Sequence, residues 1–331
     1  MHLDAVGTIR HSLPEVLPFD YYTDREAAWL LAQHMGDDAS VRALKAGRLA
    51  RHLDRTLLRP LVARSGGVVR RADVLALAYA DRALRLPDVG AAASAALATI
   101  CESDWHDFEL TFDLWEDYQI TRPGANLVVQ MGFPSDHAAL MGRYFRDDVR
   151  HKFEESFHPV RKDGRPTLAW ARLDIDIATG EALIEEVQSD WLRFVTWERE
   201  DLEHNAPRSR DLIATRAYEQ AVLARYAKLW PRALMLAVLM LLRDRLALRS
   251  VWMHTPALGM VLKGIWGSGP PRSLYTSLPK SFGFEATREV PAFLTVTDRR
   301  RGVPRISRAT ARRLRQMRGH EGPLFWRMQF D

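Results

Sequence analysis

Hydrophobic residues recur at helical spacing through about the first 120 residues of this chain. Thr23-Asp24 is a candidate cap for the helical segment TDREAAWLLAQHM. The same pattern continues in three further segments: residues 39–64, RRADVLALAYADRAL and the alanine-rich VGAAASAALATICESDW. Arginines and acidic residues lie between their apolar positions. These segments predict a mostly helical region over residues 1–120.

After Pro123-Gly124 the pattern changes to short β-branched runs separated by long helical segments. Thr179-Gly180 separates TLAWARLDIDI from EALIEEVQ, which predicts a β-hairpin. Helices are predicted at 137–157, twice within 189–248, at 257–267, 271–282 and 306–319, and strands at 127–133, 250–255, 284–290, 293–296 and 323–330. The fold class is therefore α/β (α+β): a helical region (1–120), then a mixed sheet flanked by helices (121–331).

The hairpin register decides which side chains share a face of the sheet. With Thr179 and Gly180 as a two-residue loop, Leu173 lies opposite Glu186, and Asp174 lies opposite Glu185. Glu186 and Gln188 then fall on the apolar face, together with Ala171, Leu173, Ile175, Ala182 and Ile184. A slip of one residue would exchange the two faces.

A carboxylate on an apolar face must find a partner, open onto a cleft or hold its proton. Burial raises the pKa of such a group, which suits a general base, so Glu186 is a candidate. The alternative is a structural salt bridge from Glu186 to a helix arginine. Ser189-Asp190 is a candidate helix cap, and the earlier Ser103-Asp104-Trp105 repeats the same three residues as Ser189-Asp190-Trp191.

Other candidate chemistry has a weaker basis in the sequence. Asp174, Asp176 and Glu185 share one face and could bind Mg²⁺ or Ca²⁺, although solvated charges at a strand edge are the alternative. His254 ends a predicted strand, where α/β proteins place ligands, but it could equally be an ordinary hydrogen-bonded histidine. His151 and His158 are expected at the surface. The glycines of the GIWGSG segment lack the spacing of a dinucleotide-binding loop.

Composition limits the classes of protein without selecting one. The chain has 331 residues, 47% of them hydrophobic and 27% charged, which is ordinary for a globular protein. One cysteine, Cys101, allows no intramolecular disulfide, and the first residues lack a signal-peptide pattern, so a cytoplasmic location is expected. The apolar run 233–242 is shorter than the roughly 20 residues of a membrane span, and no membrane partner is expected.

A formal charge of +5 is compatible with an anionic partner. Arginines concentrate between residues 299 and 318, and a helical arrangement would place several on one face that could contact nucleic-acid phosphates: Arg308, Arg312, Arg313 and Arg315. The alternative is a solvated basic face. Few aromatic residues lie among them, so stacking on single-stranded nucleic acid is not supported.

The heptapeptide EEVQSDW at 185–191 resembles a signature of uncharacterised domains in phage and mobile-element polyvalent proteins. The YTSLPK segment at 275–280 is similar to a second block of those domains, and the matching order covers about 165–290. This resemblance implies, as one alternative, a non-catalytic mobile-element or host-interaction protein that binds nucleic acid or a protein partner.

The same region also resembles the acyl-CoA-binding half of a GNAT-type N-acetyltransferase, with its hairpin, helix, strand, helix and closing strands. This resemblance implies an acyltransferase that uses acetyl-CoA or another acyl thioester on a small or peptidic amine. It implies Glu186 as base and Tyr275 as acid. His254 is a third catalytic candidate, and the candidates for substrate binding are Glu185, Gln188, Ser189, Asp190 and Lys280. One departure is that no glycine-rich pyrophosphate loop follows Gln188; the sequence there is SDWLRFVTWERED.

Overall fold

The computed structural model describes residues 1, 3–80, 90–116, 119–264, 271–295, 307–317, 319 and 321–330. The chain forms two compact units: the larger consists of 1–18, 108–280 and 284–329, and the smaller of 19–107, 281–283 and 330–331. The sequence places the boundary near residue 120; the division of the structure falls between residues 107 and 108, and it assigns the first 18 residues to the larger unit.

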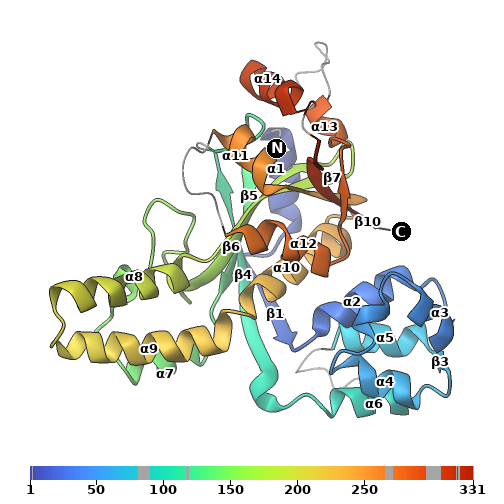
Figure 1. Ribbon diagram of the computed structural model, residues 1–331, viewed down its shortest axis with the longest axis horizontal. Helices are drawn as coiled ribbons and strands as arrows, with labels where there is room; N and C mark the ends of the chain where they lie inside the picture. Colours follow the sequence, from blue (N-terminus) through green and yellow to red (C-terminus); the bar gives the residue numbers. More distant parts are fainter. Residues whose placement is uncertain are drawn as a thin grey trace. The chain divides into compact units, whose positions relative to one another are not determined.

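The fold is α/β, with an eight-stranded mixed sheet and flanking helices (Figure 1). The strand order is β1-β4-β5-β6-β7-β8-β10-β9. The strands are β1 (Val16–Tyr22), β4 (Trp105–Trp115), β5 (Asn126–Gly132), β6 (Thr167–Asp176), β7 (Glu181–Gln188), β8 (Ser250–His254), β9 (Glu285–Thr287) and β10 (Phe325–Gln329). Strands β4, β5, β6 and β7 form successive antiparallel pairs. Strand β10 is antiparallel to both β8 and β9, whereas β7 and β8 are parallel.

The helices of the larger unit differ from the predicted ones in number and in length. They are α1 (Leu3–Ser12), α7 (His137–Gly142), α8 (Asp190–Asn205), α9 (Arg210–Tyr226), α10 (Trp230–Met240), α11 (Pro256–Lys263), α12 (Ser277–Ser281), α13 (Ala292–Thr295) and α14 (Arg308–Met317). Short 3₁₀ turns lie at Arg150–Lys152 and Arg272–Tyr275, and a π-helical turn, Leu241–Arg245, extends α10. Helices α8 and α9 pack against each other, as Figure 1 shows, and α8 and α10 pack against β6.

Several predicted elements in this unit are corrected. The helix over 137–157 is limited to α7 and a 3₁₀ turn, and 189–248 holds three α-helices instead of two. The segment predicted as a strand at 293–296 lies in helix α13 as far as the structure describes it. The strands predicted at 127–133, 250–255 and 323–330 and the hairpin are confirmed.

The smaller unit is mainly helical, as the apolar spacing predicts. It contains α2 (Arg25–His34), α3 (Val41–Ala46), α4 (Leu58–Arg64), α5 (Arg71–Ala78) and α6 (Ala91–Leu97), 3₁₀ turns at Ala50–His52 and Glu102–Asp104, and a small pair of strands, β2 (Ala39–Ser40) and β3 (Val68–Val69). Helix α2 packs against α5, and α4 and α5 pack against α6. Trp105 begins strand β4, so Ser103-Asp104-Trp105 leads into a strand, whereas Ser189-Asp190-Trp191 leads into helix α8.

The hairpin register differs from the predicted one. Residues 177–180 form the loop, so Asp176 lies opposite Glu181 and Asp174 lies opposite Leu183 rather than Glu185. A β-bulge then shifts the register between Arg172 and Leu173. Glu186 consequently lies opposite Arg172, and Gln188 lies opposite Trp170. Because paired residues share a face, the prediction that Glu186 and Gln188 lie on the apolar face was wrong.

The face of the hairpin that carries Arg172 and Asp174 holds a buried ion cluster. The Arg122 guanidinium donates to Asp174 through Nε (3.0 Å) and Nη2 (2.7 Å), and to Asp176 through Nη1 (2.8 Å). The Met1 amino group also donates to Asp174 Oδ1, at 2.6 Å. Burial alone would raise the pKa of Asp176, but hydrogen bonds from Arg122 and Thr179 lower it below its ordinary value. The Arg122 guanidinium therefore compensates the charge of both carboxylates.

Farther along the same face, apolar side chains of β7, β8 and β10 pack under α11, α13 and α14. The cluster contains Leu183, Trp252, Leu258, Leu262, Phe293, Leu294, Leu314, Leu324 and Phe325. This packing fixes α11 beside the ends of β7 and β8, because Leu258 and Leu262 of α11 lie in the same cluster as Leu183 and Trp252.

Replacing Arg122 with leucine should lower the free energy of unfolding of the larger unit by about 3–5 kcal/mol, because it leaves Asp176 without its cation and the buried Asp174 with the Met1 amino group alone. Urea denaturation followed by tryptophan fluorescence measures the change. The control is Arg216→Leu, which removes a salt bridge to Glu203 from a side chain that is 62% exposed and should change stability by less than about 1 kcal/mol. Equal effects of the two substitutions would contradict the structural role of Arg122.

Candidate functional site

A cavity of about 540 Å³ lies where β7 and β8 separate. The parallel pairing of these strands ends at Ile184 opposite Met253, so the last four residues of β7 continue beyond it. The polar groups that line the cavity come from β7, β8 and the elements that follow them, and include Glu186, Gln188, His254, Lys263 and Tyr275. The cavity lies entirely within the larger unit.

Glu185 occupies the β-bulge and is fully buried. Its Oε1 accepts a hydrogen bond from the Thr121 backbone N–H at 2.9 Å, and its Oε2 accepts one from the Thr121 hydroxyl at 2.8 Å. Since that hydroxyl donates to Glu185, its oxygen accepts from His254 Nε2, which is 3.2 Å away. This assigns the proton of the neutral His254 ring to Nε2.

His254 is 1% exposed, and its Nδ1 is buried without a hydrogen-bond partner among the residues that the structure describes. Burial, followed by the charge of Lys263, lowers its pKa to about 3. The 3.9 Å separation between Nδ1 and Glu185 Oε2 is therefore not an ion pair at neutral pH, because the imidazole is uncharged. His254 is a poor proton acceptor, although its Nδ1 lone pair could accept a hydrogen bond.

Glu186 is held between two cations. Its Oε2 accepts from Arg172 Nη2, directly across the hairpin, and from Lys263 Nζ at 3.4 Å. Burial alone would raise its pKa, but the charges and hydrogen bonds of Lys263 and Arg172 lower it below the ordinary value. The predicted raised pKa was therefore wrong, and the salt-bridge alternative describes the geometry of Glu186, with a strand arginine and a lysine as partners. A carboxylate in this state binds cationic or hydrogen-bond-donating groups and is a weak base.

Two side chains bind the free backbone edge of β7 beyond the separation. Lys263 Nζ donates to the Glu185 carbonyl oxygen at 2.6 Å, and the Val187 N–H donates to the Tyr275 hydroxyl oxygen at 3.2 Å. Burial, followed by the charge of Glu186, raises the pKa of Tyr275. Tyr275 consequently keeps its proton at neutral pH, and its O–H remains able to donate.

The start of α8 forms the opposite part of the cavity wall. Asp190 is 3% exposed and lies in the first turn of α8. Its carboxylate accepts hydrogen bonds from His158 Nδ1 (2.9 Å), Trp170 Nε1 (2.8 Å) and Arg193 (2.6 Å), and also from the Gln188 amide. His158, expected at the surface, has a side chain that is 28% exposed and lines the cavity.

Ser189 is the N-cap residue of α8, but its hydroxyl does not make the capping hydrogen bond. It donates instead to the Leu168 carbonyl oxygen at 2.6 Å. Ser189 lines the cavity. Glu185 and Gln188, which were also predicted to contact substrate, line it too. Lys280 is not among the residues that line it; its Nζ lies 5.6 Å from the centre of the Trp326 ring.

An apolar wall completes the cavity, and includes Trp197, Trp230, Met260 and Leu274. The Arg193 guanidinium lies over the Trp197 ring, 5.0 Å from its centre. Trp197 is 51% exposed and Trp230 only 8%, so the wall runs from an open edge to a buried side. An apolar wall opposite a few fixed polar groups is typical of small-molecule sites.

The remaining predicted features do not come together at this cavity. Asp174 and Asp176 bind Arg122 while Glu185 binds Thr121, and in the described ranges no group of three or more metal-binding side chains could hold an ion. Gly264 ends α11, whereas Gly267 and Gly269 lie outside the described residues. Of the arginines between residues 299 and 318, the structure likewise leaves Arg299, Arg300, Arg301, Arg305 and Arg318 undescribed.

In the basic helix α14, Arg312 and Arg315 are exposed, and Arg313 donates to the Leu262 carbonyl oxygen at 2.8 Å. Leu314 of the same helix is buried in the cluster under α11. The amphipathic character of α14 therefore attaches it to the larger unit, while nucleic-acid binding through its arginines stays a prediction.

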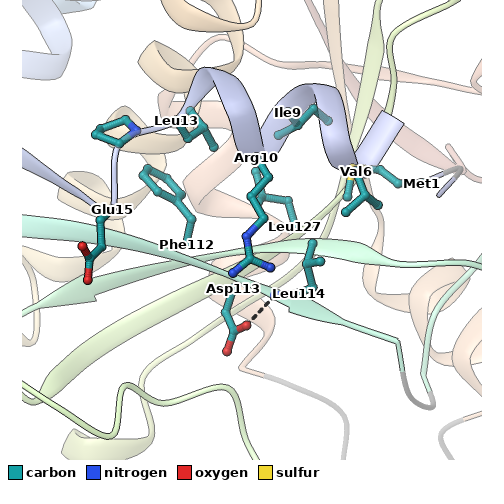
Figure 2. A pocket seen from close by; sticks show the side chains of 11 residues that line it. Met1, Val6, Ile9, Arg10, Leu13, Glu15, Phe112, Asp113, Leu114 and Leu127 are labelled. Carbon is teal, nitrogen blue, oxygen red and sulfur yellow. Dashed lines mark hydrogen bonds between the residues drawn. The ribbon is translucent and has the colours of Figure 1, made fainter. Parts of the chain in front are cut away.

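A second, smaller cavity of about 210 Å³ lies between α1 and strands β4 and β5 (Figure 2). Its apolar lining includes Ile9 of the helix, Leu13 directly after the helix, and Phe112 and Leu127 of the strands. The charged side chains there are Arg10, Glu15 and Asp113, and the Asp113 carboxylate accepts from the Leu114 N–H at 2.8 Å. Among the described residues that line it, the charged side chains of Arg10, Glu15 and Asp113 are exposed, whereas those at the end of β7 are buried or half-buried, so the larger cavity is the better candidate site.

Comparisons with known proteins found no match to the chain among family models, curated proteins or solved structures. Of the helices in the described part of the chain, none combines the length and the apolar character needed to cross a membrane.

The buried neutral His254 should make stability depend on pH. Below about pH 6.5 the unfolded state binds a proton that the folded state excludes until about pH 3, so acidification lowers the free energy of unfolding. His254→Gln should reduce this loss by up to about 1.4 kcal/mol per pH unit. Urea denaturation at about pH 7 and about pH 5 measures it, with exposed His151→Gln as the control. If the free energy of unfolding depended on pH equally in His254→Gln and in the wild type, burial would not prevent His254 from binding a proton in the folded state.

Proposed function

We propose that the cavity at the end of β7 transfers an acyl group from a thioester to an amine. The observation that carries this proposal is the separation of the parallel strands β7 and β8 beside a cavity of about 540 Å³. The order of elements also supports it: hairpin β6–β7, helices α8 to α10, strand β8, helices α11 and α12, then β9 and β10. This is the order that the GNAT-type resemblance implies.

A carboxylate oxygen in the cavity can bind an amine as the acyl acceptor. Glu186 is a carboxylate at neutral pH, and its side chain is 16% exposed, so it can accept a hydrogen bond from an amine although Arg172 and Lys263 compensate its charge. The apolar wall formed with Trp197, Trp230 and Met260 can hold the carbon part of the same molecule. Glu186 thus binds the acceptor rather than removing its proton.

Tyr275 is positioned to protonate the departing thiolate. Its oxygen accepts from the Val187 N–H, which leaves the hydroxyl proton for a group in the cavity. The attacking amine forms the C–N bond, the C–S bond breaks, and the sulfur takes a proton as thiol. Tyr275 is the candidate acid in this step.

The start of α8 does not fit the pyrophosphate of coenzyme A. A pyrophosphate site needs free backbone N–H groups and no competing anion, whereas Asp190 places a buried carboxylate in the first turn. The hydrogen-bond donors Arg193 and His158, which could otherwise contact an anion at this turn, already bind Asp190. The proposed donor is therefore an acyl thioester whose recognition does not depend on a nucleotide at α8.

Acetyl-CoA and S-acetyl-N-acetylcysteamine, a thioester without a nucleotide, should be turned over with kcat/KM values within about tenfold of each other, since less than about 1.4 kcal/mol of recognition would come from the nucleotide. Thiol release with ethanolamine, phenethylamine and a lysine peptide measures this. Strong selectivity for acetyl-CoA would contradict the donor assignment alone. No thiol release with any amine, and no heat on titrating either thioester, would remove the acyltransferase proposal.

Tyr275→Phe should lower kcat for thiol release by about 100-fold with little change in KM, because it removes the acid and keeps the ring. The control is Tyr144→Phe, which removes a hydroxyl from a tyrosine outside the cavity lining. A Tyr275→Phe enzyme as fast as the control would exclude Tyr275 as the acid.

A further inference from the structure

We infer that His158 is the general base of the site and that Asp190 is its positioning residue. The inference rests on the proposed transfer to an amine, and it identifies the group that accepts the amine proton. Neither Glu186 nor His254 suits that role: Glu186 is ion-paired with Arg172 and Lys263, and His254 is fully enclosed.

The Asp190 carboxylate is fixed in place by donors on both oxygens. Oδ2 accepts from Trp170 Nε1 and His158 Nδ1, whereas Oδ1 accepts from Arg193 and Gln188. Burial alone would raise the pKa of Asp190, but hydrogen bonds from His158 and Trp170 lower it below the ordinary value. The group therefore remains an acceptor for the imidazole.

This arrangement determines the tautomer of His158. A carboxylate can only accept, so Nδ1 of the neutral ring carries the proton, and the lone pair lies on Nε2. The Gln188 amide nitrogen is 3.2 Å from Nδ1, but a protonated Nδ1 cannot accept from it, and the amide donates to Asp190 instead. Within the described parts of the chain, Nε2 has no hydrogen-bond partner, and the side chain remains 28% exposed.

The ring is also oriented by packing. Trp170 lies 5.4 Å from the His158 ring in an edge-to-face arrangement, and its own N–H is bound to Asp190. Trp170 and Gln188 of the β6–β7 hairpin therefore fix the Asp190 carboxylate, and this carboxylate in turn orients the His158 imidazole. This is the arrangement of nucleophile-activating pairs, in which a carboxylate sets the tautomer and stabilises the imidazolium.

The step balances within the proposed reaction. As the amine nitrogen bonds to the thioester carbonyl carbon, its proton passes to His158 Nε2, and the resulting imidazolium is compensated by Asp190. The C–S bond then breaks and the sulfur receives a proton from Tyr275. Exchange with solvent returns a proton to Tyr275 and removes one from His158, so the sum is thioester plus amine giving amide plus thiol.

Thiol release from S-acetyl-N-acetylcysteamine in the presence of phenethylamine tests the inference on the full chain. His158→Gln should lower kcat at least about 100-fold while KM stays within about twofold, since a base acts in the transition state. The matched control is His151→Gln, which removes an exposed histidine outside the cavity and should keep wild-type rates. A His158→Gln enzyme within twofold of the control would overturn the assignment.

Two measurements that need no turnover test the pair itself. Nitrogen-15 NMR of the wild-type protein should show His158 protonated on Nδ1 at neutral pH, and Asp190→Asn should redistribute the tautomer. Diethyl pyrocarbonate should modify His158 faster than His254, which is 1% exposed. An Nε2–H tautomer in the wild type would overturn the inference even if thiol release occurs. If the wild type releases no thiol, the proposed function fails, and the role of His158 as base fails with it. The tautomer of His158 still shows whether the His158–Asp190 pair exists.

Discussion

The buried contact between Arg122 and the two carboxylates of β6 is the interaction on which the candidate site depends. Asp174 and Asp176 lie on one face of the hairpin, where two buried like charges would repel without a cation between them. The planar guanidinium binds both and also lies over the Phe293 ring, 4.5 Å from its centre. Because Thr121 precedes Arg122, the same contact brings Thr121 to Glu185 and, through its hydroxyl, to His254.

The β-bulge decides what the acidic end of β7 faces. In a regular strand Glu185 and Glu186 would point to opposite faces, and Glu186 would share the face of Leu173 and Ile184. The bulge inserts one residue, so that Glu186 is paired with Arg172 instead. Both acids are thereby compensated, Glu185 by hydrogen bonds from Thr121 and Glu186 by cations. The extra residue explains why a buried strand can carry two adjacent carboxylates.

The sequence was sufficient to predict most of the sheet, because apolar β-branched runs between turn residues are local signals. Strand β4 was missed although Phe108, Leu110, Phe112 and Leu114 alternate with polar residues, which is the period of a half-buried strand. The bulge leaves no comparable trace, since it depends on strand pairing. The predicted site residues Glu186, His254 and Tyr275 do line one cavity. However, Lys263 was not recognised as the partner of Glu186, Thr121 as that of His254, or His158 as that of Asp190. Those contacts are made across the fold, and no spacing in the sequence encodes them.

Glu186 and Asp190 show how two carboxylates four residues apart acquire different roles. Glu186 is bound by two cations and has a side chain that is 16% exposed, so one of its oxygens can still accept a hydrogen bond from a ligand. Asp190 accepts only from groups of the protein, among them an imidazole that reaches the cavity in its place. Because the environments of the two acids differ in this way, the same short segment can bind an amine at one acid and orient a base at the other. The separation of β7 from β8 then determines where that chemistry is accessible.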